Sequence, residues 1–240
     1  MQLAIFDIDG TLTRTTQLDG DCFLRAVTDE LGELPISTNW RDYTHITDSG
    51  MTQQIFRDHL GRAPRDEELA RVQQRFVDLL EESLAPHVQS SLQVPGAAEA
   101  LAQLHDAGWA VAIATGSWRA CALLKLERAG IEIDGVPTAF ADDAVARTEI
   151  VATAWSRSQA AYARAHFARV VSIGDGVWDV RTARALNLPF VGVRPDGRAA
   201  MLRARGVSHV LPDFADFERL LRSLREAQVP VRSDPPERAT

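Results

Sequence analysis

Six short apolar runs alternate with longer stretches of helical periodicity, and this alternation restricts the possible folds more than any other feature of the chain. Each run is rich in β-branched residues, is bounded by Gly, Asp or Pro, and has the length of a buried strand. The expected strands are residues 3–8, 110–115, 138–141, 170–174, 190–193 and 209–211. The expected helices among them are residues 96–108, 118–130, 148–163, 179–187 and 214–228. This order predicts an α/β fold, in which helices cover both faces of a mostly parallel sheet.

One long segment departs from the alternation. Between about residues 16 and 91 there is no convincing strand pattern, and helical patterns cover residues 21–32, 51–61 and 65–88. We interpret this segment as an all-helical insertion with linkers near residues 13–16 and 92–95. The expected organisation is therefore a core of residues 1–15 and 92–228, a helical domain of residues 16–91, and a polar, proline-rich flexible tail of residues 229–240.

Charge and composition narrow the class of partner. The net charge of −7 disfavours binding to nucleic acid or to an anionic membrane surface. No run approaches the roughly 18 apolar residues of a membrane span, and the chain starts on a strand-like run rather than a signal peptide, so we expect a cytoplasmic protein. Two cysteines about a hundred residues apart, Cys22 and Cys121, give neither a disulfide framework nor metal-ligand spacing. The expected partner is a small molecule.

Polar side chains follow four of the expected strands. Asp7 and Asp9 close the first strand, Thr115 closes the second, Arg147 follows the third, and the run GDGVWD at residues 174–179 follows the fourth. Ligands of open parallel sheets bind at the carboxyl ends of the strands, so we expect these side chains to meet there.

The acidic residues of this group predict a metal site. Asp7 and Asp9 point to the same side because side chains alternate along a strand, and two unpaired carboxylates in a buried position repel each other. A hard divalent cation would offset that charge, and Asp175 and Asp179 could supply further oxygen ligands. Magnesium is the natural candidate, since it pairs with substrate phosphate oxygens. Gly116 would let backbone amides approach an anion closely.

This pattern resembles the haloacid dehalogenase-like superfamily, in its magnesium-dependent phosphatase branch. DIDGTLT at residues 7–13 matches the family's first motif, AIATG at residues 112–116 matches its strand ending in Ser or Thr, and GDGVWD matches its acidic fourth motif. The resemblance covers roughly residues 1–13 and 92–225. It implies a Rossmann-like core, with the helical insertion acting as a cap over the active site, as in the phosphoglycolate-phosphatase group.

The resemblance also implies a role for each matched residue. Asp7 would be the nucleophile that becomes an aspartyl-phosphate, and Asp9 the acid that protonates the leaving oxygen and then the base that activates water. Asp175, Asp7 and the backbone carbonyl of Asp9 would bind magnesium, with Asp179 as a direct or indirect ligand. Thr115 would hydrogen-bond the phosphoryl group.

Two cations compete for the role of neutralising the phosphate. Arg147 lies 32 residues after Thr115 and 28 before Asp175, close to the family's usual interval, and opens a helix. Lys125 lies ten residues after Thr115 in the middle of an expected helix, where we expect a solvated face. We therefore assign the role to Arg147, although the family more often has lysine there and the planar guanidinium binds oxygens differently.

The cap stretch WRDYTHITDSGMTQQIF, residues 40–56, supplies the candidates for substrate contact. In the resembling phosphatases the loop before such a helix faces the active site, which points to His45, Thr47 and Asp48. Each has a structural alternative. Thr47, Asp48 or Ser49 could instead be the N-cap residue of the following helix, and His45 could be a half-buried imidazole. An acidic residue in this loop suits a substrate with hydroxyl or amino groups.

Three functions remain compatible with these residues. The first is a magnesium-dependent phosphomonoesterase acting on a small phosphorylated metabolite, and Asp9 favours phosphoester chemistry because true haloacid dehalogenases lack it. The second is a phosphomutase of the β-phosphoglucomutase type, which shares core and cap. The third is a non-catalytic binding module, which would be expected to have lost Asp7 or Asp9.

Overall fold

The central sheet orders the whole molecule. In this computed structural model, which describes residues 1–231, the described residues form a sheet of six parallel strands in the order β3-β2-β1-β4-β5-β6. The strands are β1 (Gln2–Phe6), β2 (Trp109–Ala114), β3 (Thr138–Ala139), β4 (Val170–Gly174), β5 (Phe190–Val193) and β6 (His209–Leu211). All six strands expected from the sequence are present. At the carboxyl end of β1, Phe6 pairs with Ile113 of β2 and Ile173 of β4, which brings the ends of three strands together.

Helices cover both faces of this sheet, as the alternation predicts. They are α5 (Ala97–Asp106), α6 (Arg119–Arg128), α7 (Arg147–Ala161), α8 (Val177–Ala185), α9 (Ala199–Arg203) and α10 (Phe217–Glu226). Alternate residues of β1 point to opposite faces: Leu3 and Ile5 join the core beneath α7, α8 and α9, whereas Ala4 and Phe6 join the core beneath α5 and α10. Both faces of the strands are buried, which explains why they read as continuous apolar runs.

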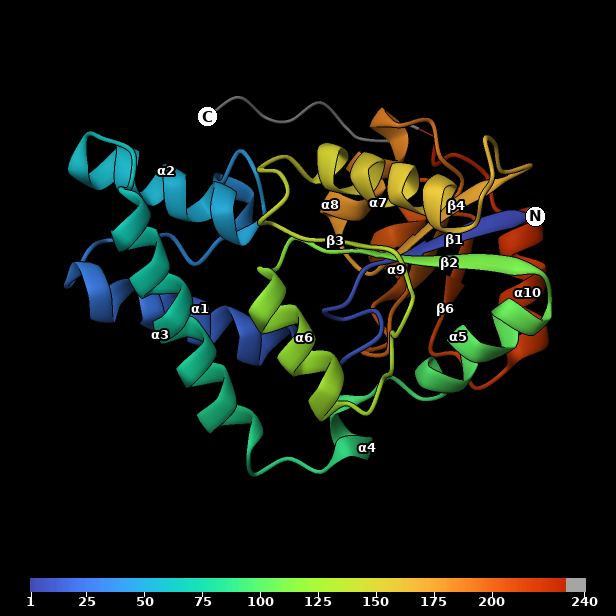
Figure 1. Cartoon of the computed structure of the whole chain (residues 1–240), viewed down its shortest axis with the longest axis horizontal. Coiled ribbons are helices and arrows are strands. Elements are labelled where there is room, and N and C mark those ends of the chain that lie inside the picture. Colours follow the sequence, from blue (N-terminus) through green and yellow to red (C-terminus); the bar gives the residue numbers. More distant parts are fainter. Residues whose placement is uncertain (232–240) are drawn as a thin grey trace.

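The inserted segment is helical and lies to one side of the sheet (Figure 1). It contains α1 (Thr16–Leu31), a short 3₁₀ turn η1 (Trp40–Asp42), α2 (Asp48–Leu60) and α3 (Asp66–Leu84), and α4 (Gln89–Leu92) leads back to the core. Residues 16–92, all of them described, include no strand. Helix α1 packs along α3, and α3 packs on α6 of the core.

An aromatic cluster joins the insertion to the core. The ring of Phe23 in α1 lies 5.7 Å from that of Phe76 in α3, and both lie within 6.3 Å of the Trp118 ring that precedes α6. These rings are almost fully buried. Such contacts contribute packing energy beyond the burial of area and hold the two parts together.

The two linkers of the insertion run side by side. Thr13 pairs with Gln93 in an antiparallel bridge, and the Val94 amide donates to the Leu12 carbonyl at 3.0 Å. The insertion therefore leaves and re-enters the core at one place, beside the end of β1.

The C-terminal tail is only partly described. Arg184 of α8 donates from Nε to the Pro230 carbonyl at 3.1 Å, and Pro230 is buried, so the first residues of the expected tail contact the core. The remaining part of the expected tail, residues 232–240, lies outside the described residues. Within residues 1–231, no helix combines the length and apolarity needed to cross a bilayer.

Candidate active site

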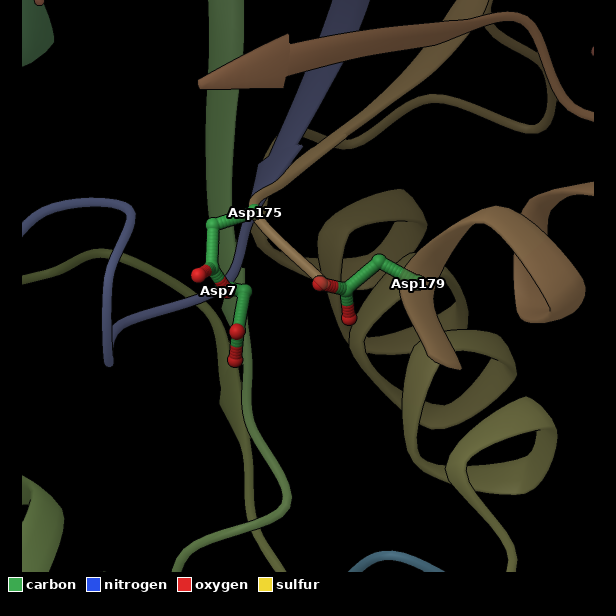
Figure 2. A group of neighbouring side chains, drawn as sticks. All are labelled: Asp7, Asp175 and Asp179. Atoms are coloured by element: carbon green, nitrogen blue, oxygen red, sulfur yellow. The ribbon is translucent and has the colours of Figure 1, made fainter. Parts of the chain in front are cut away.

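Three carboxylates converge at the carboxyl ends of β1 and β4. Asp7 directly follows β1, Asp175 directly follows β4, and Asp179 lies in the first turn of α8 (Figure 2). Each offers one oxygen to a group whose members lie within 4.8 Å of one another, and each residue is only 5% exposed. The structure therefore brings these three acids close together, as the sequence predicts.

The donor set suits a hard divalent cation. Burial raises the pKa of Asp175 well above its ordinary value, and the neighbouring Asp179 and Asp7 carboxylates raise it further. Burial likewise raises the pKa of Asp7, and it raises that of Asp179 to about 7 although Arg147 opposes it. The Asp175 Oδ1 atom is buried and has no hydrogen-bond partner among the described residues. Magnesium binds carboxylate oxygens and would offset their mutual repulsion. Three close carboxylates, one of them with an unpartnered oxygen, therefore suit a magnesium ion.

Two arginines partly balance these acids. Arg147 Nη1 lies 2.9 Å from Asp179 Oδ1 and 3.2 Å from Asp7 Oδ1. Arg194, which follows β5, donates from Nη1 to Asp175 Oδ2 at 3.1 Å. Arg147 begins α7, as expected, so the helix fixes the base of its side chain beside the nucleophile candidate.

Two glycines make this close packing possible. Gly10 has φ of +79°, and a Cβ there would lie 2.3 Å from Asp175 Oδ2. A Cβ at Gly116 would lie 2.7 Å from Arg147 Nη2 and 2.9 Å from the Ile46 carbonyl oxygen. Gly116 therefore acts through the absence of a side chain, which lets the guanidinium and the cap loop approach the core.

Asp9 has a different environment from Asp7. Its Oδ2 accepts from Lys125 Nζ at 2.6 Å and from Ser117 Oγ at 3.0 Å, and its Oδ1 accepts from Thr15 Oγ1 at 2.6 Å. Burial works to raise the pKa of Asp9, but the Lys125 ammonium and these hydrogen bonds hold it below its ordinary value. The Asp9 side chain thus turns away from the three-carboxylate group toward α6.

The expectation of a solvated Lys125 is wrong. The side chain is 0% exposed, and Nζ also contacts Asp19 Oδ1 of α1 at 2.5 Å and Ser117 Oγ at 2.8 Å. Burial alone would lower the lysine pKa, but the Asp19 and Asp9 carboxylates raise it above its ordinary value. Lys125 therefore remains an ammonium that links the core carboxylate Asp9 to the cap carboxylate Asp19.

The loop before α2 is fastened to the core. Thr47 is the N-cap of α2, since its Oγ1 accepts from the Gly50 amide at 3.1 Å, and it also donates to the Val145 carbonyl at 2.8 Å. Asp48 Oδ2 accepts from the Trp118 amide at 2.7 Å. Ser49 Oγ donates to the Ala141 carbonyl and accepts from Trp118 Nε1. The capping alternative for Thr47 is confirmed, and the same loop reaches the active-site pocket.

A pocket of about 70 Å³ collects most of the candidate residues. Those of the core that line it are Asp7, Asp9, Thr115, Gly116, Ser117, Arg147 and Trp178, and those of the cap include Asp19, Thr47 and Asp48. His45 is half-buried and lines a neighbouring hollow with Arg147 and Trp178 instead. The structure does not place His45 with the other substrate-contact candidates, in keeping with the imidazole alternative.

Sequence reasoning considers Lys125 but places it on a solvated helix face, and it does not find Asp19 or Arg194. One signal for Lys125 was present: it is the sole lysine of a chain in which Lys and Arg together number 26. A lysine ammonium is compact and has three donors, so it can contact several oxygens at once where the planar guanidinium of arginine would fit differently. Asp19 and Arg194 lie outside the recognised motifs, and the sequence carries no comparable signal for them.

Comparisons with known proteins agree with this geometry. Residues 1–187 match the family model of haloacid dehalogenase-like hydrolases. A phosphoglycolate phosphatase of Mesorhizobium japonicum is 27% identical over 201 residues, which cover 80% of this chain and 82% of that protein.

Solved structures share the fold. A hydrolase from Pseudomonas syringae superposes with a TM-score of 0.70 at 23% identity, over 93% of this chain and 99% of that one. CbbY from Rhodobacter sphaeroides, solved in complex with phosphate, gives a TM-score of 0.60 at 20% identity, over 89% of this chain and 95% of that one. At these identities the likeness concerns the arrangement of core and helical insertion.

Proposed function

Since this chain belongs to the haloacid dehalogenase-like hydrolase family, we propose that it is a magnesium-dependent phosphatase that hydrolyses a small phosphate monoester through an aspartyl-phosphate intermediate. One observation carries the proposal: Asp7 and Asp9 line one pocket, and of the two only the Asp7 side chain belongs to the group of three carboxylates that could hold a metal. Asp7 lies among acids and Arg147, whereas Asp9 is bonded to an ammonium and two hydroxyls. Asp7 would thus lie beside the metal and the phosphoryl group, where a nucleophile is needed, and Asp9 lies apart from the three carboxylates in the same pocket, where it can exchange a proton with the leaving oxygen and with water. The phosphatase relative from Mesorhizobium japonicum supports the same reaction class.

The reaction we propose has two displacements. An Asp7 carboxylate oxygen attacks the phosphorus, the ester P–O bond breaks, and the leaving oxygen takes a proton from Asp9. Asp9, now a carboxylate, takes a proton from water as the water oxygen attacks the phosphorus. The bond between Asp7 and phosphorus then breaks, which releases inorganic phosphate and restores both carboxyl groups.

The surrounding residues orient these groups. Arg147 lies 3.2 Å from Asp7 Oδ1, where it can hold the nucleophile in place and donate to the phosphoryl oxygens. Thr115 and Gly116 line the same end of the pocket and can donate to the remaining oxygens. Lys125 holds Asp9 through Oδ2, which fixes the position of the Asp9 carboxyl group in both halves of the reaction.

Asp7, Asp175, Asp179 and the backbone carbonyl of Asp9 would hold the magnesium ion. The fit rests on the convergence of the three side chains and on the unpartnered Asp175 Oδ1 atom. When bound, the ion supplies positive charge that offsets the carboxylates and the phosphate oxygens. The carboxylate of Asp9 belongs to the Lys125 network and would not take part in this coordination.

Phosphate release from a panel of phosphorylated metabolites tests the proposal. The native protein should release phosphate in the presence of magnesium and not after chelation, and Asp7→Asn should release none. A folded, magnesium-loaded protein that releases phosphate from no ester of the panel would refute the proposed function.

Hydrolysis in ¹⁸O-labelled water separates the phosphatase from the phosphomutase. A phosphatase incorporates one labelled oxygen into each phosphate released, because water completes the second displacement. A mutase returns the phosphoryl group to the substrate, so an isomerised ester without labelled phosphate would favour the mutase instead.

A further inference from the structure

The active-site pocket has two chemically different ends. The core end, with Asp7, Thr115 and Arg147, is the end at which the proposed reaction places the phosphoryl group. We call the part lined by cap residues, among them Asp19 of α1 and Asp48 of α2, the cap end; it adjoins the core end, since the Asp48 amide donates to the Gly116 carbonyl at 2.8 Å. The alcohol to which the phosphate is attached must occupy this cap end. The side chains that line the cap end therefore indicate the chemical class of that alcohol.

The cap end has more acidic side chains than basic ones. Asp9, Asp19 and Asp48 face it, and Lys125, fully buried behind Asp9 and Asp19, supplies one positive charge against three carboxylates. Burial raises the pKa of Asp48 well above its ordinary value, and the nearby Asp19 carboxylate raises it further, so a cation bound beside Asp48 would favour its carboxylate form. Arg147, the one arginine that lines the pocket among the described residues, is bonded to Asp7 and Asp179 at the other end.

Asp48 has an oxygen to spare for a ligand. The residue is 3% exposed, and its Oδ2 accepts from the Trp118 amide. Within residues 1–231 its Oδ1 accepts no hydrogen bond, although the residue lines the pocket. This oxygen is not among the buried polar atoms of the described residues that lack a partner, so it is open to the pocket, where a donor on the substrate could bond to it.

Apolar and aromatic side chains form the rest of the cap end. Phe23, Trp40 and Met51 line it, and the aromatic faces of Phe23 and Trp40 can attract a cation. The pocket measures about 70 Å³, so a leaving group of a few heavy atoms can fit there. Carboxylates beside aromatic rings in a small space favour a short chain that ends in a positive charge.

We propose that the leaving alcohol carries an ammonium group, so that this protein acts on small aminoalkyl phosphates. The inference rests on the proposed phosphatase function and names its substrate class. A carboxylate on the leaving group, as in phosphoglycolate, would meet Asp48 and Asp19 without a free cation to receive it. An ammonium would offset their charge and donate to Asp48 Oδ1.

Three esters of similar size test the inference: phosphoethanolamine, propyl phosphate and phosphoglycolate. Phosphoethanolamine and propyl phosphate differ in the ammonium group at the end of the same short chain. With magnesium at pH 7.5, we expect kcat/KM for phosphoethanolamine to exceed that for propyl phosphate by about ten-fold or more, with phosphoglycolate the poorest substrate. Equal or faster turnover of propyl phosphate or phosphoglycolate would overturn the inference and leave the phosphatase proposal intact.

The variant Asp48→Asn tests whether Asp48 causes the preference for a substrate with an ammonium group. It keeps the shape of the side chain and an oxygen for the Trp118 amide but removes the charge. We expect the ratio of kcat/KM between phosphoethanolamine and propyl phosphate to fall about five-fold or more, mainly through a higher KM for phosphoethanolamine. Asp58→Asn, at an exposed position of the same helix, should keep the native ratio. A native ratio in Asp48→Asn would overturn the assignment to this residue.

A binding measurement decides the inference independently of turnover. In Asp7→Asn, titration calorimetry with magnesium present should give tighter binding of phosphoethanolamine than of propyl phosphate. Equal affinities, or tighter binding of phosphoglycolate, would refute the ammonium preference even if no ester of the set were hydrolysed.

Discussion

Replacing Lys125 with methionine should destabilise the protein strongly. The ammonium contacts Asp9, Asp19 and Ser117 and has no exposure to solvent, so Lys125→Met leaves two largely buried carboxylates without their shared cation. Breaking a buried ion pair by removing one partner costs about 3–5 kcal/mol. Methionine fills most of the lysine volume and adapts to its surroundings, so the loss reports charge rather than a cavity.

The expected change in melting temperature follows from the size of the chain. For domains of this size, 1 kcal/mol shifts Tm by about 2–4 °C. A loss of about 3–5 kcal/mol therefore predicts a Tm lower by about 6–20 °C at a pH where both carboxylates are ionised.

The loss of stability in Lys125→Met should depend on pH, and the raised pKa of Asp19 sets the direction of that dependence. Burial and the Asp9 carboxylate raise the pKa of Asp19 to about 7 in the folded protein, above its unfolded value of 3.8. The folded state therefore binds more protons than the unfolded state, and stability rises as pH falls through 7. Loss of the lysine raises this folded pKa further, so the deficit of the variant is largest at pH 8 and shrinks toward pH 5.

Urea denaturation of metal-free protein at pH 8 and pH 5 measures the loss of unfolding free energy in Lys125→Met and the change of that loss with pH. Arg71→Met is the matched control, since Arg71 forms an exposed pair with Glu30 at 3.1 Å, and its loss should cost less than about 1 kcal/mol. A Lys125→Met deficit below about 1 kcal/mol at pH 8, or one of equal size at both pH values, would refute the reasoning.

Three further substitutions probe the active site and the attachment of the cap. Gly116→Ala places a Cβ 2.7 Å from Arg147 Nη2, so we expect phosphate release to fall at least about ten-fold and the unfolding free energy to drop by about 1–3 kcal/mol, measured by kinetics and urea titration. Asp175→Asn removes a carboxylate from the expected magnesium site, and the rise in Tm on adding magnesium, which thermal denaturation should record for the native protein, should vanish; an unchanged rise would contradict this ligand assignment. Ser49→Ala leaves the buried Trp118 Nε1 without its acceptor and should cost about 1–3 kcal/mol in urea, whereas a loss near zero would mean that the loop is not fastened there.

The fold was predictable because its signals are local. Each expected strand has its own apolar run and each core helix its own periodicity, so the order of elements and the helical insertion could be predicted without knowledge of tertiary contacts. Parallel strands then place their carboxyl ends at one edge. Asp7, Thr115 and Asp175 meet there because each directly follows its strand.

Contacts between helices were not predictable in the same way. Lys125 lies on α6, and its periodicity is equally compatible with a solvated side chain, because the sequence does not specify which helix packs against that face. In the structure α3 covers α6 and α1 packs along α3, which encloses Lys125 and brings Asp19 to it across 106 positions of sequence. His45 and Asp48 are likewise neighbours in the cap loop, yet one side chain lines the active-site pocket and the other lines a separate hollow.

The sequence by itself determined the α/β core, the helical insertion and the acids that follow the strands, because strand periodicity and parallel pairing fix which residues reach one edge of a sheet. Tertiary structure alone decided that Lys125 is a buried partner of Asp9, that Asp19 belongs to the site, and which cap residues face the pocket. These contacts depend on the rotation and packing of helices that are distant in sequence, which no local pattern encodes.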